Sequence, residues 1–153
     1  MLSTLADIGY ADVAQELLFQ DTVPSWLYMK KKGATTIWEN WGGIDDEGKI
    51  DASLNHYSKG AVISYLHQYI AGLKTTLPAY KSFLVKPHIA PHVNDVELIL
   101  DTPQGRVEVE WHLKGGKFEI RILVPQGSSA SAELPDGSTH QLSPGENTIR
   151  VDV

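Results

Sequence analysis

The sequence predicts an α+β protein, in which a short segment of about three helices precedes an antiparallel β-sandwich. Apolar residues recur at helical spacing up to about residue 73, whereas apolar and polar residues alternate after residue 80. Turn-forming residues separate the alternating runs at short intervals, as is typical of sandwiches. We therefore expect a helical segment at residues 1–73 and a β-sandwich domain at residues 74–153.

The first expected helix begins near Ser3, a residue type whose hydroxyl suits the N-cap position. Its apolar residues recur at roughly helical spacing: Leu5, Ile8, Val13, Leu17 and Leu18. Residues 21–25, DTVPS, should end this helix, because they combine turn-forming residues with a proline.

Two further helices are expected before residue 73. A short one should start at Pro24, run through Trp26 and Met29, and end at Gly33. Residues 34–54 include the turn-rich stretch GGIDDEGKIDAS and should form a loop. A longer helix is expected at residues 56–71, with Gly72 as its C-terminal cap. One apolar stripe runs along it: Ala61, Val62, Tyr65, Leu66, Tyr69 and Ile70.

Period-two alternation predicts the strands of the sandwich. In residues 106–113 the apolar members share one face: Val107, Val109, Trp111 and Leu113. The Gly-Gly pair at residues 115–116 suits a tight hairpin turn, and residues 118–124 continue the alternation beyond it. Further strands are expected at residues 130–134 and 148–153, with turns between them.

Composition excludes several classes of function. The formal net charge is −6, with 13 Lys and Arg against 19 Asp and Glu, which argues against a nucleic-acid partner. No apolar run is long enough to span a membrane, so no membrane partner is expected. The first residues lack a signal peptide, and cysteine is absent; both fit a cytoplasmic chain, although a longer parent enzyme could carry an export signal. Histidines and carboxylates lack metal-ligand spacing, so neither a metal nor a cofactor is expected.

Residues 33–41, GATTIWENW, place one carboxylate, Glu39, between Trp38 and Trp41. Aromatic rings stack on the apolar faces of sugars, and carboxylates bond sugar hydroxyls, so the group suits a carbohydrate site. A carboxylate that loses solvation among rings is also prepared for acid or base work. The alternative is that Glu39 is exposed and the two tryptophans belong to the core.

A second cluster, SLNHY at residues 53–57, precedes the third expected helix. Its imidazole, on His56, can donate to and accept from a sugar hydroxyl. The alternative is structural, because Ser53 or Asn55 could cap the helix that follows.

Four stretches together resemble bacterial α-L-rhamnosidases, at the C-terminal end of the (α/α)6-barrel catalytic domain of that family. They are PSWLYM at 24–29, GATTIWENW at 33–41, SLNHYSKGAV at 53–62 and IAG at 70–72. The remainder is similar to the family's C-terminal β-sandwich, with GRVEVEW at 105–111 and Val-Pro at 124–125. One position departs from the family pattern, since Asn40 stands where an arginine is usual.

The resemblance implies inverting hydrolysis of terminal α-L-rhamnose. Such enzymes use two carboxyl groups about 6.5–9.5 Å apart, one as general acid and one as general base. By the motif match, Glu39 corresponds to the base and His56 to a residue that contacts L-rhamnose or a rhamnosylated glycan. The tryptophans that would shape or support the pocket are Trp26, Trp38 and Trp41.

The general acid of the family comes from an earlier part of the barrel than these residues match. The resemblance therefore implies a glycoside hydrolase fragment that carries the base, lacks the acid and is inactive alone. Two alternatives stay open: a non-catalytic module that binds rhamnose or a polysaccharide, and a self-associating interaction protein. Exposed apolar helical faces would favour a homo-oligomer.

Overall fold

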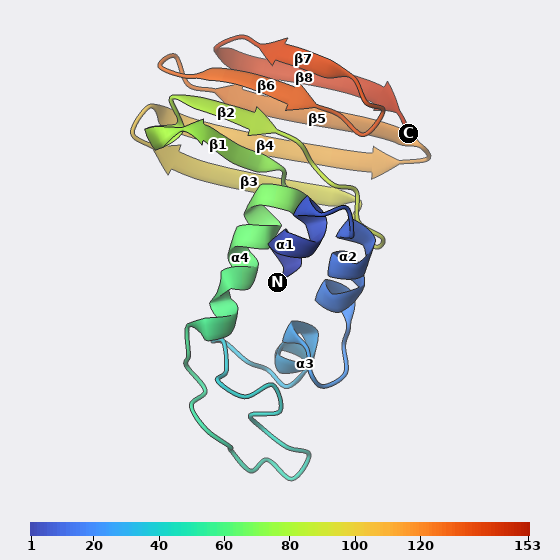
Figure 1. Ribbon diagram of the computed structural model, residues 1–153, viewed down its shortest axis with the longest axis vertical. Helices are drawn as coiled ribbons and strands as arrows, with labels where there is room; N and C mark the ends of the chain where they lie inside the picture. The colour runs from blue at the N-terminus through green and yellow to red at the C-terminus, as the bar shows by residue number, and fades with distance from the viewer. The chain divides into compact units, whose positions relative to one another are not determined.

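The computed structural model describes residues 1–153 and divides into two compact units, Met1–Tyr65 and Leu66–Val153. The first unit is helical and includes a long loop before its last helical turns, and the second contains two β-sheets (Figure 1). The expected order of helices followed by a sandwich is confirmed. The domain boundary after residue 73 stays a prediction, and the compact units meet eight residues earlier.

The first expected helix is two helices, α1 (Leu2–Asp7) and α2 (Ala11–Phe19). Gly9 lies between them with φ of +90°, a conformation that glycine adopts without steric cost and that continues neither helix. The expected cap at Ser3 is wrong, because α1 already begins at Leu2 with no side-chain cap. The helices α1 and α2 pack together through small and aliphatic side chains; the buried ones are Leu2, Ala6, Ala14 and Leu18.

The second expected helix is α3 (Trp26–Lys31), and its N-cap is Ser25 rather than Pro24. The buried Ser25 hydroxyl accepts a hydrogen bond from the Tyr28 amide at 2.9 Å, which satisfies one of the free N–H groups of the first turn. The chain leaves the helix at Gly33, as expected, and the Ala34 amide donates to the Met29 carbonyl at 3.0 Å. Met29 is the buried anchor of this helix.

The third expected helix lies where the sequence predicts it, but it is not one regular α-helix. A 3-10 turn, η1 (Ser58–Ala61), leads into α4 (Val62–Tyr65), and the second unit opens with a π-turn, η2 (Leu66–Ile70). Neither Ser53 nor Asn55 caps the start. The N-cap is Tyr57, which makes no side-chain cap, and His56 Nδ1 accepts the Ser58 amide at 3.2 Å.

Two four-stranded sheets lie face to face in the second unit (Figure 1). One has the order β1-β2-β6-β7, formed by β1 (Leu73–Leu77), β2 (Ser82–Val85), β6 (Ser129–Glu133) and β7 (Thr139–Leu142). The other has the order β3-β4-β5-β8, formed by β3 (Asp95–Thr102), β4 (Gly105–Lys114), β5 (Lys117–Val124) and β8 (Gly145–Asp152). Pairing is antiparallel except between β2 and β6, which run parallel because the chain visits the other sheet between them.

The core of the sandwich follows the alternation in the sequence. Strand β4 buries Val107, Val109 and Trp111, and β5 buries the facing side chains Phe118, Ile120, Ile122 and Val124. The rings of Trp111 and Phe118 pack with centroids 5.5 Å apart. The expected hairpin turn is also present, with Lys114 paired to Lys117 across Gly115 and Gly116.

Residues before β1 are part of this core. The Trp111 indole donates to the carbonyl of Ile70 at 3.1 Å, in a buried position. The Gly72 carbonyl accepts a hydrogen bond from the Lys86 amide at 2.8 Å, and a Cβ on Gly72 would lie 2.3 Å from the nitrogen of Pro87. Only glycine fits here, because its φ of +87° and the close approach both exclude a side chain. The end of η2 is thus fastened to the sandwich.

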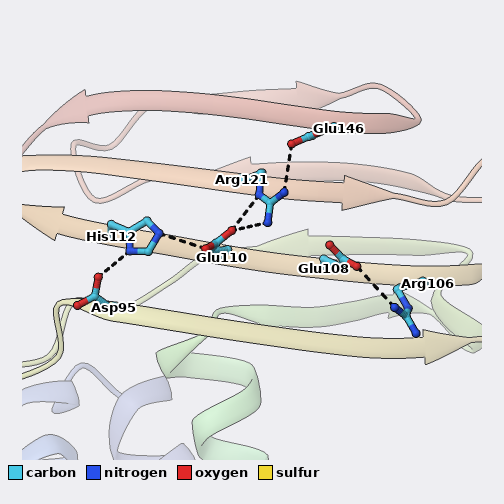
Figure 2. Close-up of polar contacts among 7 residues, drawn as sticks. All are labelled: Asp95, Arg106, Glu108, Glu110, His112, Arg121 and Glu146. Carbon is cyan, nitrogen blue, oxygen red and sulfur yellow. Dashed lines mark hydrogen bonds and ion pairs between the residues drawn. The ribbon is translucent and has the colours of Figure 1, made fainter.

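The outer face of the β3-β4-β5-β8 sheet carries a chain of alternating charges (Figure 2). His112 contacts Asp95 through Nδ1 at 2.6 Å and Glu110 through Nε2 at 3.3 Å. Glu110 also accepts from Arg121 Nε at 2.9 Å, and Arg121 reaches Glu146 at 3.4 Å. The hydrogen bond from Arg121 lowers the pKa of Glu110, and the one to Asp95 raises the pKa of His112. Side chains of all four strands therefore join across the sheet.

Replacing His112 with Gln is expected to remove part of the pH dependence of the sandwich's stability. The hydrogen bond to Asp95 raises the pKa of His112 above its ordinary value of 6.5, so folding favours the protonated ring. That stabilisation is complete below the unfolded-state pKa and is lost as pH rises through the folded-state pKa. Urea unfolding from about pH 5.5 to about pH 8 should show wild-type stability falling more than that of His112→Gln. Asp95→Asn is the matched control and should flatten the profile similarly; equal slopes in all three proteins would contradict the assignment.

Candidate functional site

The loop that follows α3 brings the two sequence clusters together. The Glu39 amide donates to the Ser53 carbonyl at 2.8 Å, and the His56 amide donates to the Ile37 carbonyl at 2.7 Å. The Ser53 amide in turn donates to Glu39 Oε2 at 3.2 Å. Residues 37–39 and 53–56 therefore lie alongside each other, and Glu39 and His56 are held in one loop region.

The expected loop at residues 34–54 is closed by its own hydrogen bonds. A bridge pairs Ile44 with Ile50, and the Tyr28 hydroxyl donates to the carbonyl of Ile44 at 3.1 Å. Asn40 donates to Asp51 Oδ2 at 2.7 Å, a bond that links the two sides of the loop. The residue that departs from the family pattern thus has a local structural role.

The three tryptophans have different environments. Trp38 is fully buried, and Gly43 packs on it so closely that a Cβ there would lie 3.1 Å from the indole. Trp26 and Trp41 are half-buried and meet edge to face, with ring centroids 4.9 Å apart. Trp38 therefore fits the alternative of a core residue, whereas Trp26 and Trp41 retain exposed ring surface.

A cavity of about 290 Å³ adjoins Trp26 and Trp41 in the helical unit. Its wall also includes hydroxyls of Ser3, Ser58 and Ser64 and the side chain of Lys59. Glu39, His56 and Trp38 do not line it. The structure thus groups the five expected site residues in two places: Trp26 and Trp41 at the cavity, and Glu39, Trp38 and His56 in the paired loop segments.

Glu39 and His56 present polar groups at the surface of the loop. The Glu39 side chain is exposed, and the Ser53 amide orients one of its oxygens. The His56 ring stacks on Tyr57, with centroids 5.2 Å apart and planes 12° from parallel. His56 Nδ1 lies 3.2 Å from the Ser58 amide and 2.9 Å from the Ser58 hydroxyl, so Nε2 is the ring nitrogen that could exchange a hydrogen bond with a ligand hydroxyl.

Lys59 is a residue of the site that the sequence did not single out. Its ammonium group donates to the carbonyl oxygens of Trp38, at 3.4 Å, and Glu39, and it lies 4.8 Å from the Trp41 ring centroid. Its own carbonyl accepts the Trp26 indole N–H at 3.0 Å. The only signal in the sequence was its position in SLNHYSKGAV, three residues after His56.

No group of three or more His, Asp or Glu side chains is arranged to hold a metal ion. None of the helices combines the length and the apolar character that crossing a membrane requires.

Two family models match the chain in tandem. The bacterial α-L-rhamnosidase 6 hairpin glycosidase domain matches residues 1–70, and the bacterial α-L-rhamnosidase C-terminal domain matches residues 72–149. A six-hairpin glycosidase segment joined to a β-sandwich defines the class as glycoside hydrolase. Within that class, the chain belongs to the bacterial α-L-rhamnosidase family.

Relatives in sequence agree with this assignment. The chain is 33% identical over 139 residues to an α-L-rhamnosidase of Alteromonas sp. (strain LOR). The matched region covers 88% of this chain and 15% of the relative. It is 31% identical over 142 residues to an α-L-rhamnosidase of Formosa agariphila. That matched region covers 90% of this chain and 15% of the relative. The chain therefore spans about 15% of the length of these relatives.

Solved structures extend the likeness to the fold. The Streptomyces avermitilis α-L-rhamnosidase complexed with L-rhamnose superposes with a TM-score of 0.92 at 28% identity, covering 99% of this chain and 17% of that one. The native α-L-rhamnosidase of Aspergillus terreus gives a TM-score of 0.93 at 31% identity, over 97% and 18% of the two chains.

Proposed function

We propose that this chain carries the general base of an inverting α-L-rhamnosidase, on Glu39, and that its 153 residues alone do not hydrolyse rhamnosides. The observation that carries the proposal is the pairing of residues 37–39 with 53–56, which holds Glu39 and His56 together in a chain of this family. A relative of the same fold is known with L-rhamnose bound, which supports rhamnose or a rhamnosylated glycan as the ligand.

The chemistry proposed for Glu39 is removal of a proton from water. An inverting base activates a water molecule that attacks the anomeric carbon from the face opposite the leaving group. The Glu39 carboxylate is exposed, so water reaches it, and the Ser53 amide fixes the orientation of Oε2. His56 Nε2 would exchange a hydrogen bond with a rhamnose hydroxyl.

The tryptophans have separate proposed roles. Trp26 and Trp41 would contact the apolar face of the sugar or support the pocket wall, because they keep exposed ring surface beside the cavity. Trp38 would support the site rather than contact the sugar. It is fully buried and immediately precedes Glu39 in the sequence, so it would anchor the loop that carries Glu39.

The general acid is proposed to lie in a part of the enzyme that these residues do not match. The relatives are several times longer than this chain, which leaves room for a second carboxyl group and for most of the pocket wall. A missing general acid typically costs about 10²–10⁴-fold in rate. Lost positioning of the substrate lowers the rate further, by up to about 10⁵-fold or more. A lone base is therefore insufficient for turnover.

The chain alone is expected to release no more p-nitrophenol from p-nitrophenyl α-L-rhamnoside than Glu39→Gln or buffer does. The physical reason is that leaving-group protonation has no assigned donor among the matched residues. The two proteins should be compared at equal concentration, with unfolding curves to show that both are folded. Turnover that disappears in Glu39→Gln would contradict the proposal, because an acid would then be present in this chain or in a second copy.

Two other expectations stay predictions. A non-catalytic module would bind rhamnose without cutting it, and the same assay followed by a rhamnose titration distinguishes it from an enzyme. Self-association as a homo-oligomer would use apolar side chains that the helical unit exposes; they include Ile8, Tyr10, Val13 and Ile63.

A further inference from the structure

We propose that Lys59 is a positioning residue, which holds the Glu39 peptide and the Trp41 ring in the arrangement that the site uses. The role assigned to the site rests on the proposed function, but the arrangement itself can be tested without any ligand. Lys59 lies in η1, twenty residues after Glu39, so its contacts join two distant parts of the helical unit.

The Lys59 ammonium is directed to main-chain oxygens and an indole face rather than to a carboxylate. It donates to the carbonyls of Trp38 and Glu39, and it lies 4.8 Å from the centroid of the Trp41 ring. Hydrogen bonds from a charged donor are stronger than those between neutral groups, and a cation over an indole face adds electrostatic attraction. A lysine that served only solubility would extend into water instead.

These contacts complete the fixation of Glu39. The Glu39 amide is held by the Ser53 carbonyl, and its carboxylate by the Ser53 amide. Without Lys59, nothing among these contacts would hold the carbonyl side of Glu39, which leads into the turn at residues 40–43. Rotation of that peptide would move the Glu39 side chain and Trp41 together.

The contact with Trp26 is different in kind. The Trp26 indole donates to the main-chain carbonyl of Lys59 at 3.0 Å, so any residue at position 59 could accept it. Loss of the ammonium should disturb Glu39 and Trp41 and leave the Trp26 hydrogen bond in place.

The test is NMR spectroscopy of the ligand-free chain with Lys59→Met, which keeps the methylene stem and removes the charge. Wild type should show the Lys59 ε-methylene protons shifted upfield by the Trp41 ring, a reading that needs no variant. In Lys59→Met, the Glu39 amide and Trp41 indole signals should move, and the indole signal of Trp111, which lies in the second unit, should not. Lys59→Arg restores a cation and should return both signals toward wild type.

Three results would overturn the inference. One is an unshifted Lys59 side chain in wild type. Another is a Lys59→Met spectrum with Glu39 and Trp41 unchanged. The third is an equal change at Trp111, Glu39 and Trp41 that Lys59→Arg does not reverse, since this indicates general loss of structure rather than loss of a positioning charge.

A rhamnose titration separates this inference from the proposed function. If the chain binds rhamnose, Lys59→Met should weaken binding about tenfold, because two contacts of a charged donor that hold the Glu39 loop are lost. Lys59→Arg should recover most of the affinity. If wild type shows no binding up to millimolar rhamnose, the non-catalytic binding module is contradicted, and the ligand-free signals still decide whether Lys59 positions Glu39.

Discussion

A chain that begins at Lys74 is expected to lose the folded sandwich, whereas a chain that begins at Leu66 is expected to keep it. The shorter chain lacks Leu73, which is fully buried and pairs with Val85, and Ile70, which is 6% exposed. Truncation of one such aliphatic side chain to alanine costs about 2–5 kcal/mol. The Trp111 indole also loses its acceptor on Ile70, which costs about 1–3 kcal/mol for a buried donor. These losses approach the whole stability of a small domain, about 5–15 kcal/mol.

Urea unfolding monitored by far-UV circular dichroism checks this expectation, since it also reads a chain without tryptophan. The chain of residues 66–153 should unfold cooperatively, and the chain of residues 74–153 should show a non-cooperative or absent transition. Trp111→Phe in the longer chain is the matched control, since it removes the indole donor but keeps an aromatic ring in the core. Equal midpoints for the two chains would show that the helix end and Gly72 are not part of the folding unit.

Glu39→Gln is expected to abolish hydrolysis when the remainder of a rhamnosidase is supplied. The substitution keeps the size of the side chain and its ability to accept from the Ser53 amide, but it removes the basic oxygen. Loss of a general base typically costs about 10²–10⁴-fold in rate. The effect requires the general acid, so it appears only in a complete catalytic domain, which is the difference from the assay of the chain alone.

The sandwich could be predicted where the alternation of residues is strong. Strand β5 buries every second side chain, and β4 does so from Val107 to Trp111, with Leu113 half-buried, so their pattern in the sequence is clear. Strands β1, β2 and β7 have only four or five residues each, too few for a period to be recognised. Strand β3 lies at a sheet edge and buries none of its residues fully, so burial marks its pattern weakly. The parallel pairing of β2 and β6 depends on long-range topology that no local pattern encodes.

The helical unit shows where local signals failed. Spacing predicted one helix across Gly9, because the apolar period continues through a residue whose φ is positive. The N-cap of η1 is Tyr57, and the first amide of the turn, that of Ser58, is bonded by the preceding His56 ring, although imidazole is not among the usual capping side chains. The π-turn that opens the second unit is held by tertiary contacts, including the bond from Trp111 to Ile70.

The candidate site could be predicted in composition but not in arrangement. Motifs alone identified Glu39 and His56, and the structure places their segments alongside each other. The separation of Trp26 and Trp41 from Trp38 could not be foreseen, since spacing within GATTIWENW treats the two nearer tryptophans alike. Lys59 could not be predicted as a site residue, because its contacts are with the backbone of the loop twenty residues earlier in the sequence.

The most direct test of Glu39 as a base is a chimera, in which this chain replaces the matching 17% of the Streptomyces avermitilis α-L-rhamnosidase. Hydrolysis of p-nitrophenyl α-L-rhamnoside should be measured for the chimera and its Glu39→Gln form, each with and without sodium azide. We expect hydrolysis by the chimera and its loss in Glu39→Gln. Azide should restore cleavage by the Glu39→Gln form and give the rhamnosyl azide of inverted configuration, because azide attacks without needing a base. If the Glu39→Gln chimera hydrolysed the rhamnoside as fast as the parent chimera, Glu39 would not be the general base.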